Sequence, residues 1–441
     1  MTTSCEGKES ELSIKKKNVL DSFRLNFGKY SWLPIVAVFL VAISSRLTFT
    51  GFFVGFHEDT AQFSKLEGDE RGYVNLARNI ADGRDYATGQ RDKMWRTPGY
   101  PIFLSSILMS FGYQLGIVRI FQAILGGISC VLVFFIGEKL FGTKVGLLSA
   151  LYFAIYPPHV FMSTQILSEN LLLPFSLFVV LSFMDAVKTN ALRNIVACGV
   201  VLGLAVLTRP ESGGVVLCIF GAVVVSSSAQ IRVKIYMSAC IVLFMFLVLS
   251  PWLIRNYFIA GRLVLSTVAG EAFWGGNNDF TLRDPYWRGH WKYPHELPDF
   301  DKVVSENDEV KRDQMRWRLG LDYLRNNYTE IPKLAFYKLQ RFYSVQLHDK
   351  LQRTVMILSF GLLMPFMAIG LLGGTVKLFQ DRHPGVIVSL IILYYNLLAI
   401  IFWGSNRFRL TIDPYLIIFG IWGLLVSVEK LKTLALNRLS V

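Results

Sequence analysis

Paired cysteines are absent from this chain, and the histidines do not occur at metal-ligand spacing. The 441 residues include five cysteines and no Cys-x-x-Cys pair. The sequence therefore predicts neither a disulfide framework nor a metal site built from thiolates. It identifies no cofactor and leaves the need for a divalent metal open.

Sequence signatures of soluble nucleotide and acyl chemistry are also missing. The chain carries no G-x-S-x-G, Walker or G-x-G-x-x-G motif, which argues against those reactions. Its formal charge of +13 comes without a basic stripe interleaved with aromatic residues, so nucleic acid is not an expected partner. In a membrane chain such a basic excess reflects the cytoplasmic loops.

Charged residues are few, and long apolar runs take their place. Only 17% of the residues are charged, 53% are hydrophobic and the mean hydropathy is +0.42. Because a membrane-spanning helix needs about 20 mostly apolar residues, we expect an all-α polytopic membrane protein of about 10 to 11 spans. The first run has no signal-peptide cleavage site and is expected to remain as an anchor among membrane lipids. The runs are residues 33–53, 115–138, 145–162, 166–186, 194–208, 211–228, 235–254, 354–376, 385–403 and 411–428.

The charges of the short loops orient these runs. Lysine and arginine cluster in alternate loops, which we expect in the cytoplasm together with both termini. Residues 99–112 are short for a span and are predicted to form a re-entrant or interfacial helix; if they crossed, every later loop would change sides. The predicted regions are a basic cytoplasmic tail at 1–30, a transmembrane module at 31–256 with an external loop at 54–113, a large external loop at 257–353, and C-terminal helices with a cytoplasmic tail at 354–441.

The large external loop contains a segment with helical periodicity, "EVKRDQMRWRLGLDYLRNN" at 309–327. Met315 and Leu319 begin its apolar side. We interpret the segment as a helix that lies on the membrane surface, and a substrate-specific role is the alternative.

The stretch "GDERGYVNLARNIADG" at 68–83 follows the first apolar run. From Tyr73 onward its apolar residues recur at helical spacing, and Gly83 is placed as a C-terminal stop. Two interpretations of Asp69 and Glu70 are open. Asp69 is a helix N-cap with Glu70 favourable near the positive helix end, or it is a carboxylate at the bilayer surface that acts as a general base.

Arginines at the predicted external ends of spans form a second pattern. Each of them either snorkels to the interface or binds an anionic phosphate group. Arg407 and Arg409 break the trend that positive charges lie on the cytoplasmic side. The cluster therefore indicates an anion bound at the outer membrane surface. The residues are Arg96, Arg209, Arg255, Arg407 and Arg409.

Glu169 and His159 complete the candidate set on the same face. Glu169 lies near the start of an apolar run, where a carboxylate is costly unless it is paired or faces a polar cavity. His159 follows "YPP" and is the one histidine that we keep as a possible site residue.

Several segments of the chain form a recognisable series, in the order "GDERGYVNLARNIADGRDY", "RTPGYPIFLSS", "GEKLFGTKVGLLSALYFAIYPP", "ILSENLLLP", "GLAVLTRPES", "SPWLIRNYFIAG" and "NRFRLTIDPYL". Taken together, they resemble the GT-C superfamily of membrane glycosyltransferases. The resemblance covers roughly residues 30 to 430 and is closest to the dolichyl-phosphate-mannose protein mannosyltransferase-like family, which is related to the aminoarabinose transferases that modify lipid A.

The resemblance implies a GT-C helical bundle that transfers a sugar, with inversion, from a polyprenyl-phosphate donor to a lipid, glycan or protein acceptor outside the cytoplasm. It implies that Asp69 is the catalytic or essential acid, followed by Glu70 and Tyr73 in a D-E-x-x-Y pattern, and we expect Glu70 to be a catalytic residue beside it. Arg96 stands where relatives carry a basic residue beside proline, although "RTPGYP" departs from their Lys-Pro-Pro run. The extra lumenal domain of the protein mannosyltransferases has no counterpart, so protein O-mannosylation is not implied. We expect Asp69 as the base and the arginines, with Tyr73, as the donor-binding groups.

Other functions compete with this interpretation. A flippase for lipid-linked saccharides would also need buried charges, but the chain has no inverted repeat and its polar residues gather on one face. A polysaccharide polymerase or ligase is the nearest rival among enzymes, and a scaffold of envelope biogenesis fits poorly with the external charges. We expect the inner membrane of a bacterium, with the active site on the periplasmic face.

Overall fold

The computed structural model describes residues 32–55, 66–89, 91–226, 229–345 and 350–439. Helices and their connections make up these segments, and no strand occurs in them. The predicted all-α class is therefore confirmed. The predicted basic tail at 1–30 and residues 56–65 of the predicted external loop lie outside the described residues.

Six helical stretches in the described part of the chain are long and apolar enough to cross a membrane. Each coincides with a predicted run, which confirms a multi-pass membrane protein. The stretch Arg353–Gln380 is built from α18 (Lys350–Met356), a π-helical turn (Ile357–Gly361) and α19 (Met364–Gln380). The six are α2 (Leu33–Phe53), α6 (Leu115–Phe141), α9 (Glu169–Thr189), α12 (Ile231–Ala260), Arg353–Gln380 and α22 (Asp413–Leu439).

The other predicted runs form shorter apolar helices. The expected number of about 10 to 11 spans is thus larger than the number of helices that satisfy the length criterion. One run, at 145–162, is broken because Pro157 and Pro158 cannot continue a helix interior. The shorter helices are α7 (Thr143–Ala154), α8 (Pro157–Met162), α10 (Leu192–Thr208), α11 (Val215–Ser226, preceded by a 3-10 turn at Pro210–Gly214) and α20 (Val386–Ile401).

The centre of the bundle is formed by α6, α9 and α22. In the most apolar segment of each of these helices, more than half of the residues are buried. The outer helices α2 and α12 bury only 22% and 28% of theirs. Small residues allow close contact at the centre. A Cβ on Gly370 of α19 would lie 1.9 Å from the carbonyl oxygen of Phe419 on α22.

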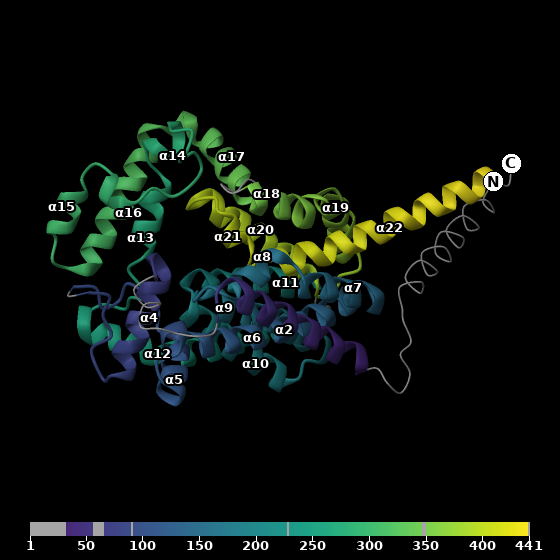
Figure 1. Ribbon diagram of the computed structural model, residues 1–441, viewed down its shortest axis with the longest axis horizontal. Coiled ribbons are helices and arrows are strands. Elements are labelled where there is room, and N and C mark those ends of the chain that lie inside the picture. Colours follow the sequence, from purple (N-terminus) through teal and green to yellow (C-terminus); the bar gives the residue numbers. More distant parts are fainter. Residues whose placement is uncertain (1–31, 56–65, 90, 227–228, 346–349, 440–441) are drawn as a thin grey trace.

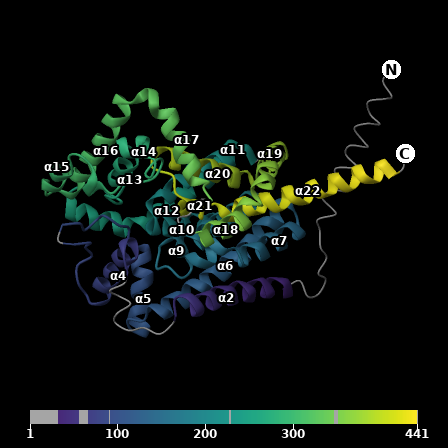
Figure 2. The ribbon, with the colours of Figure 1, turned by 45° about the horizontal axis from the view of Figure 1, so that its top comes forward.

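A second layer of short helices covers one end of the bundle (Figures 1 and 2). The predicted helix at 309–327 is confirmed as α16, whose Met315 and Leu319 pack on a small core around Trp274 and Val303. The C-terminal half of α22 extends from the opposite end of the molecule. The layer comprises α13 (Ala269–Gly276), α14 (Asp279–Arg283), α15 (Phe300–Ser305), α16 (Glu309–Asn326) and α17 (Ile331–Phe342).

Two helices from the first predicted external loop lie at the same end as this layer (Figure 2). α4 (Gly68–Ala81) confirms the helix predicted at 68–83, with Tyr73 and Ala77 on its buried side. α5 (Gly99–Phe111) packs against α4 and α6, and its length of 13 residues agrees with the short helix predicted there. The polar segments that the sequence assigned to one face therefore do gather at one end of the bundle.

Candidate active site

Asp69 lies in the first turn of α4 and faces two arginines. Its Oδ1 accepts a hydrogen bond from Arg96 Nη2 at 2.5 Å, and its Oδ2 accepts one from Arg407 Nη1 at 2.7 Å. The N-cap of α4 is Glu67, which makes no side-chain capping bond. The interpretation of Asp69 as an N-cap is therefore wrong, because the helix begins before this residue and its carboxylate points away from the helix end.

Glu70 points in a different direction from Asp69. Consecutive residues of a helix are rotated by roughly 100° about its axis, so their side chains leave on different faces. The Oε1 atom of Glu70 accepts a hydrogen bond at 2.7 Å from the backbone N–H of Ile166, in the connection between α8 and α9. This contact holds a loop, and the structure does not bring Glu70 to the arginines that surround Asp69.

Arg96 comes from a segment without regular secondary structure, residues 91–98. Its guanidinium lies 4.3 Å above the ring of Tyr73 and 4.5 Å from that of Trp95. The hydroxyl of Tyr73 in turn donates to Ser168 Oγ at 2.9 Å. Two aromatic faces therefore fix the guanidinium of Arg96 in place while its Nη2 reaches Asp69.

Arg407, on the short helix α21 (Asn406–Arg409), joins two carboxylates from distant parts of the chain. Besides Asp69 it contacts Glu169, the first residue of α9, at 2.5 Å (Nε to Oε1) and 3.2 Å (Nη2 to Oε2). The N-cap Ser405 accepts from the backbone N–H of Arg407 at 3.2 Å and so starts this helix at the required point. The paired contacts match the planar fork of a guanidinium to a carboxylate.

Arg209 extends this set on the other side of Glu169. Its backbone is extended because Pro210 follows, and the side chain turns toward Glu169, with 2.7 Å between Nη1 and Oε1. Its Nε also pairs with Glu211. We call the whole group the arginine–carboxylate network: Arg96, Asp69, Arg407, Glu169, Arg209 and Glu211.

The network balances three cations with three anions, and its members differ in exposure. The side chain of Asp69 is 37% exposed, whereas that of Glu169 is 5% exposed. Burial acts to raise the pKa of Asp69, but the charges and hydrogen bonds of Arg96 and Arg407 outweigh it and hold the pKa below its ordinary value. Asp69 is therefore the ionised and more accessible carboxylate at the surface of the network.

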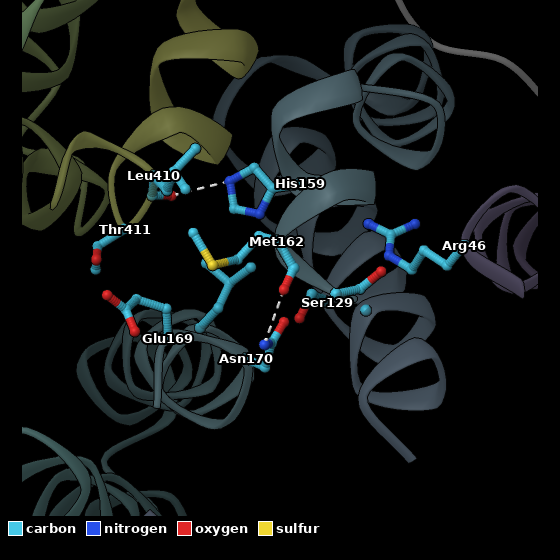
Figure 3. Close-up of a pocket in the computed structure, with 11 residues that line it drawn as sticks. Arg46, Ser129, His159, Met162, Glu169, Asn170, Leu410 and Thr411 are labelled. Atoms are coloured by element: carbon cyan, nitrogen blue, oxygen red, sulfur yellow. Dashed lines mark hydrogen bonds between the residues drawn. The ribbon is translucent and has the colours of Figure 1, made fainter. Parts of the chain in front are cut away.

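Glu169 also lines a small cavity of about 20 Å³ (Figure 3). His159, on α8, lines the same cavity, and its Nε2 lies 3.1 Å from the carbonyl oxygen of Leu410. A cavity of this size holds a single water molecule. His159 is thus placed in the wall of this cavity, where it contacts the connection between α21 and α22.

Two predicted phosphate-binding arginines lie outside the network. Arg255 of α12 donates to the backbone oxygens of Lys93 at 2.8 Å and Tyr86 at 3.1 Å. Arg409 pairs with Asp413 at 2.9 Å, and both side chains are completely buried. The structure therefore assigns contacts within the protein to Arg255 and Arg409.

A larger pocket of about 380 Å³ adjoins the network at Arg209 and Glu211. Its walls are mostly apolar and come from α13, α17, α20 and the segment before α22; they include Tyr394, Phe402, Trp403 and Phe408. No local signal in the sequence indicates these aromatic residues, or Trp95 and Ser168. Glu211 had one, since it is an acid two residues after an arginine at the end of a span.

The described residues contain no group of three His, Cys, Asp or Glu side chains that could hold a metal ion. The carboxylates of Asp69 and Glu169 do not share a cation site, because Arg407 lies between them and pairs with both. The arrangement suits an anion with several oxygen atoms, because guanidinium groups that now bind carboxylates can bind phosphate oxygens in the same geometry.

Comparison with known proteins gives a family match over part of the chain and a likeness in fold. The family model of the dolichyl-phosphate-mannose-protein mannosyltransferases matches residues 96–254. This range includes Arg96, Glu169 and Arg209 and excludes Asp69 and Arg407. No curated protein sequence matches the chain.

Solved structures of the Archaeoglobus fulgidus oligosaccharyltransferase share the fold. The archaeal oligosaccharyltransferase AglB from Archaeoglobus fulgidus, in complex with an inhibitory peptide and a dolichol-phosphate, matches with a TM-score of 0.53 at 12% identity; the match covers 94% of this chain and 52% of that one. A structure of the Archaeoglobus fulgidus oligosaccharyltransferase tethered to an acceptor peptide gives 0.53 at 13% identity, over 91% and 50%. ArnT from Cupriavidus metallidurans, bound to undecaprenyl phosphate, gives 0.42 at 15% identity, over 90% and 78%. The chain spans about half the length of the oligosaccharyltransferases that it matches, and at this identity the likeness shows the fold.

Proposed function

This chain has the GT-C fold of membrane glycosyltransferases, and from that premise we propose that it transfers a sugar from a polyprenyl-phosphate donor to an acceptor outside the cytoplasm. The acceptor is a lipid, glycan or protein hydroxyl, and the reaction is a single displacement with inversion at the anomeric carbon. The observation that carries this proposal is the position of Asp69, an accessible carboxylate held between Arg96 and Arg407.

The arginines of the network provide the phosphate site. A donor phosphate competes with the carboxylates for Arg96 and Arg407, and charge-assisted hydrogen bonds from guanidinium groups to phosphate are strong and directional. As the bond between the sugar and the phosphate breaks, negative charge grows on the leaving oxygen, and fixed cations stabilise that charge without reorganising. The dolichol-phosphate in the related AglB structure agrees with a lipid phosphate as ligand.

The pocket beside Arg209 supports a lipid-linked donor. It is mostly apolar, aromatic on several sides, and continuous with the network through Arg209 and Phe408, whose ring lies 5.1 Å from the guanidinium carbon. A ligand with a phosphate at one end and an isoprenoid chain at the other requires this combination of cations and apolar wall.

Asp69 acts as the general base. It removes the proton from the acceptor hydroxyl, the acceptor oxygen forms a bond to the anomeric carbon, and the electron pair of the broken bond leaves on the phosphate oxygen. When the phosphate takes over the hydrogen bonds of Arg96 and Arg407, the influence that lowers the pKa of Asp69 weakens. Donor binding thereby makes Asp69 a stronger base at the time when the base is needed.

The test is cleavage of the sugar-phosphate bond by the purified chain in lipid nanodiscs, with a panel of radiolabelled polyprenyl-phosphate sugars. We expect the parent to cleave one donor and Asp69→Asn to lose about 10² to 10⁴ of the rate, which is the usual contribution of a general base. Glu67→Gln is the matched control, because Glu67 is exposed, lies two residues away and makes no capping bond. It should cleave at the parent rate.

Three results would contradict the proposal in different ways. A donor that is bound or moved across the bilayer intact would indicate a flippase. Equal rates for the parent and a folded Asp69→Asn variant would remove Asp69 from the role of base. Products longer by many sugars would indicate a polysaccharide polymerase.

A further inference from the structure

The segment that carries Arg96 is held in place by residues from other parts of the chain. Residues 91–98 form neither helix nor strand, so their backbone groups need partners elsewhere. Thr267 N–H donates to the carbonyl oxygen of Met94 at 3.1 Å, and Arg255 Nη1 donates to that of Lys93 at 2.8 Å. The hydroxyl of Tyr86 donates to the carbonyl oxygens of Arg96 and Thr97 at 3.2 and 3.1 Å.

Glu309 satisfies the donors of this segment. It is the first residue of α16 in the external layer, and its side chain approaches the backbone two to three residues before Arg96. Its carboxylate accepts from the N–H of Lys93 at 2.8 Å and from the N–H of Met94 at 3.1 and 3.2 Å. It also accepts from Thr267 Oγ1 at 2.5 Å.

The environment of Glu309 is that of a residue which holds the neighbouring backbone in place, and it leaves no room for contact with a substrate. The residue is 8% exposed, and its oxygens are used by three donors from the protein. One turn further along α16, Arg312 pairs with Asp92, which adds a second attachment of the same helix to the same segment. Helix α16 thus fixes residues 92–94 through two side chains.

We propose that Glu309 is a positioning residue for Arg96, and that it connects the external layer to the active site. The inference rests on the proposed function, since it assigns Arg96 to the donor phosphate. Arg96 must reach Asp69 at 2.5 Å while it stacks on Tyr73. Without the carboxylate, two backbone N–H groups lose their acceptor and the segment relaxes. Misplacement of a binding group by about 1 Å can cost roughly 10²-fold in rate.

The first measurement is hydrogen exchange on the full chain in nanodiscs, which needs no substrate. In Glu309→Ala we expect the peptide that covers residues 91–98 to exchange at least about tenfold faster, because the amides of Lys93 and Met94 lose their acceptor. The matched variant is Asp308→Ala. Asp308 caps the same helix by accepting from Val310 N–H at 2.9 Å and Lys311 N–H at 3.1 Å, but it does not contact residues 93–94. It removes a helix cap but no acceptor of residues 93–94, so 91–98 should stay protected.

The second measurement is donor kinetics. Glu309→Ala should lower kcat/KM for the donor by about 10²-fold with little change in the acceptor KM, and Glu309→Gln should fall between, since its amide oxygen still accepts one N–H. In an Arg96→Lys background the loss caused by Glu309→Ala should shrink to about threefold or less, because two residues that act through one group are not additive.

The outcomes separate the two proposals. Unchanged exchange at 91–98 in Glu309→Ala, or equal loosening in Asp308→Ala, overturns the role of Glu309. A full kinetic loss that persists in Arg96→Lys also overturns it, because Glu309 then acts by another route. If the parent cleaves no donor, the proposed function fails, and the exchange result still decides whether Glu309 holds the segment of Arg96.

Discussion

Arg407 and Arg409 are two residues apart on α21 and have opposite surroundings. Arg407 is 29% exposed and binds two carboxylates, Asp69 and Glu169, that come from different helices. Arg409 is completely buried, lies 3.6 Å above the ring of Phe360, and pairs with Asp413, four residues further along the chain. The same type of side chain is thus used in an accessible network, at Arg407, and in a completely buried ion pair, at Arg409, which we call the sealed pair.

The difference shows how a buried charge is used. In the network Asp69, Arg407, Glu169 and Arg209 each pair with two ions of opposite charge. One partner of such an ion can therefore exchange for a ligand without leaving a charge uncompensated. In the sealed pair Asp413 is the one anion bound to Arg409 among the residues that the structure describes, and it also accepts a hydrogen bond from the hydroxyl of Tyr156 at 3.1 Å. We infer that Arg409 fixes α21 on the start of α22 and that Arg407 is left to bind the substrate.

The largest expected effect comes from breaking the sealed pair. Arg409→Met leaves Asp413 as a buried, uncompensated charge, and loss of one partner of such a pair costs about 3 to 5 kcal/mol. We expect the variant to give little folded protein, as measured by thermal unfolding and monodispersity in detergent. Arg409→Met combined with Asp413→Leu should recover most of the stability, because an apolar replacement of a whole buried pair is often neutral. A single variant as stable as the parent would show that the pair is dispensable.

A smaller effect on folding and a selective effect on activity are expected from Arg407→Gln. Asp69 keeps Arg96 and Glu169 keeps Arg209 as partners, so the melting temperature should stay close to that of the parent. Sugar-phosphate cleavage should fall by about 10² to 10³, which is the usual cost of removing one group that stabilises charge in the transition state.

Cleavage in single turnover and thermal unfolding, measured on the same preparation, check this prediction. If Arg407→Gln unfolds as readily as Arg409→Met, the contrast between the two arginines is wrong. If it cleaves the donor at the parent rate, Arg407 has no part in the reaction.

The sequence predicted the helices of this molecule well, and it predicted which residues lie at one end. Local periodicity is sufficient to place α4 and α16, and the charge of the loops groups Asp69, Arg96 and Arg407 on one face. It could not distinguish Arg407 from Arg409. On a helix of four residues, flanked by irregular chain, no period indicates which side chain faces the pocket.

The contacts that build the site were beyond the sequence for a different reason. Asp69 meets Arg407 across 338 positions, and Glu309 meets Lys93 across 216. Such pairs depend on how helices pack, and a local pattern carries no information about that. The separation of Asp69 from Glu70 could have been predicted, since helical geometry alone places these neighbours on different faces.

The smallest expected effect concerns a third buried cation, Lys338 of α17, whose hydrogen bonds go to neutral oxygens. Its Nζ donates to Asn277 Oδ1 at 2.8 Å and to the carbonyl oxygen of Ile400 at 3.0 Å, at the end of α20. Burial lowers the pKa of Lys338 from 10.5 to about 7. Between these two values the unfolded chain binds more protons than the folded chain, so the contribution of Lys338 to stability increases as the pH rises.

The variant Lys338→Met tests this prediction, because it removes a buried cation that has no carboxylate partner among its hydrogen bonds. The melting temperature of the parent minus that of Lys338→Met should increase between about pH 6 and about pH 9, and level off as the pH approaches the unfolded-state value. Lys333→Met, on the exposed side of the same helix, should give a curve parallel to that of the parent, since its partner Glu330 is also exposed. Parallel curves for Lys338→Met as well would mean that this lysine keeps its proton in the folded chain. In that case neutral oxygens alone compensate a buried cation here, and the requirement for a carboxylate partner at Arg409 would need another cause.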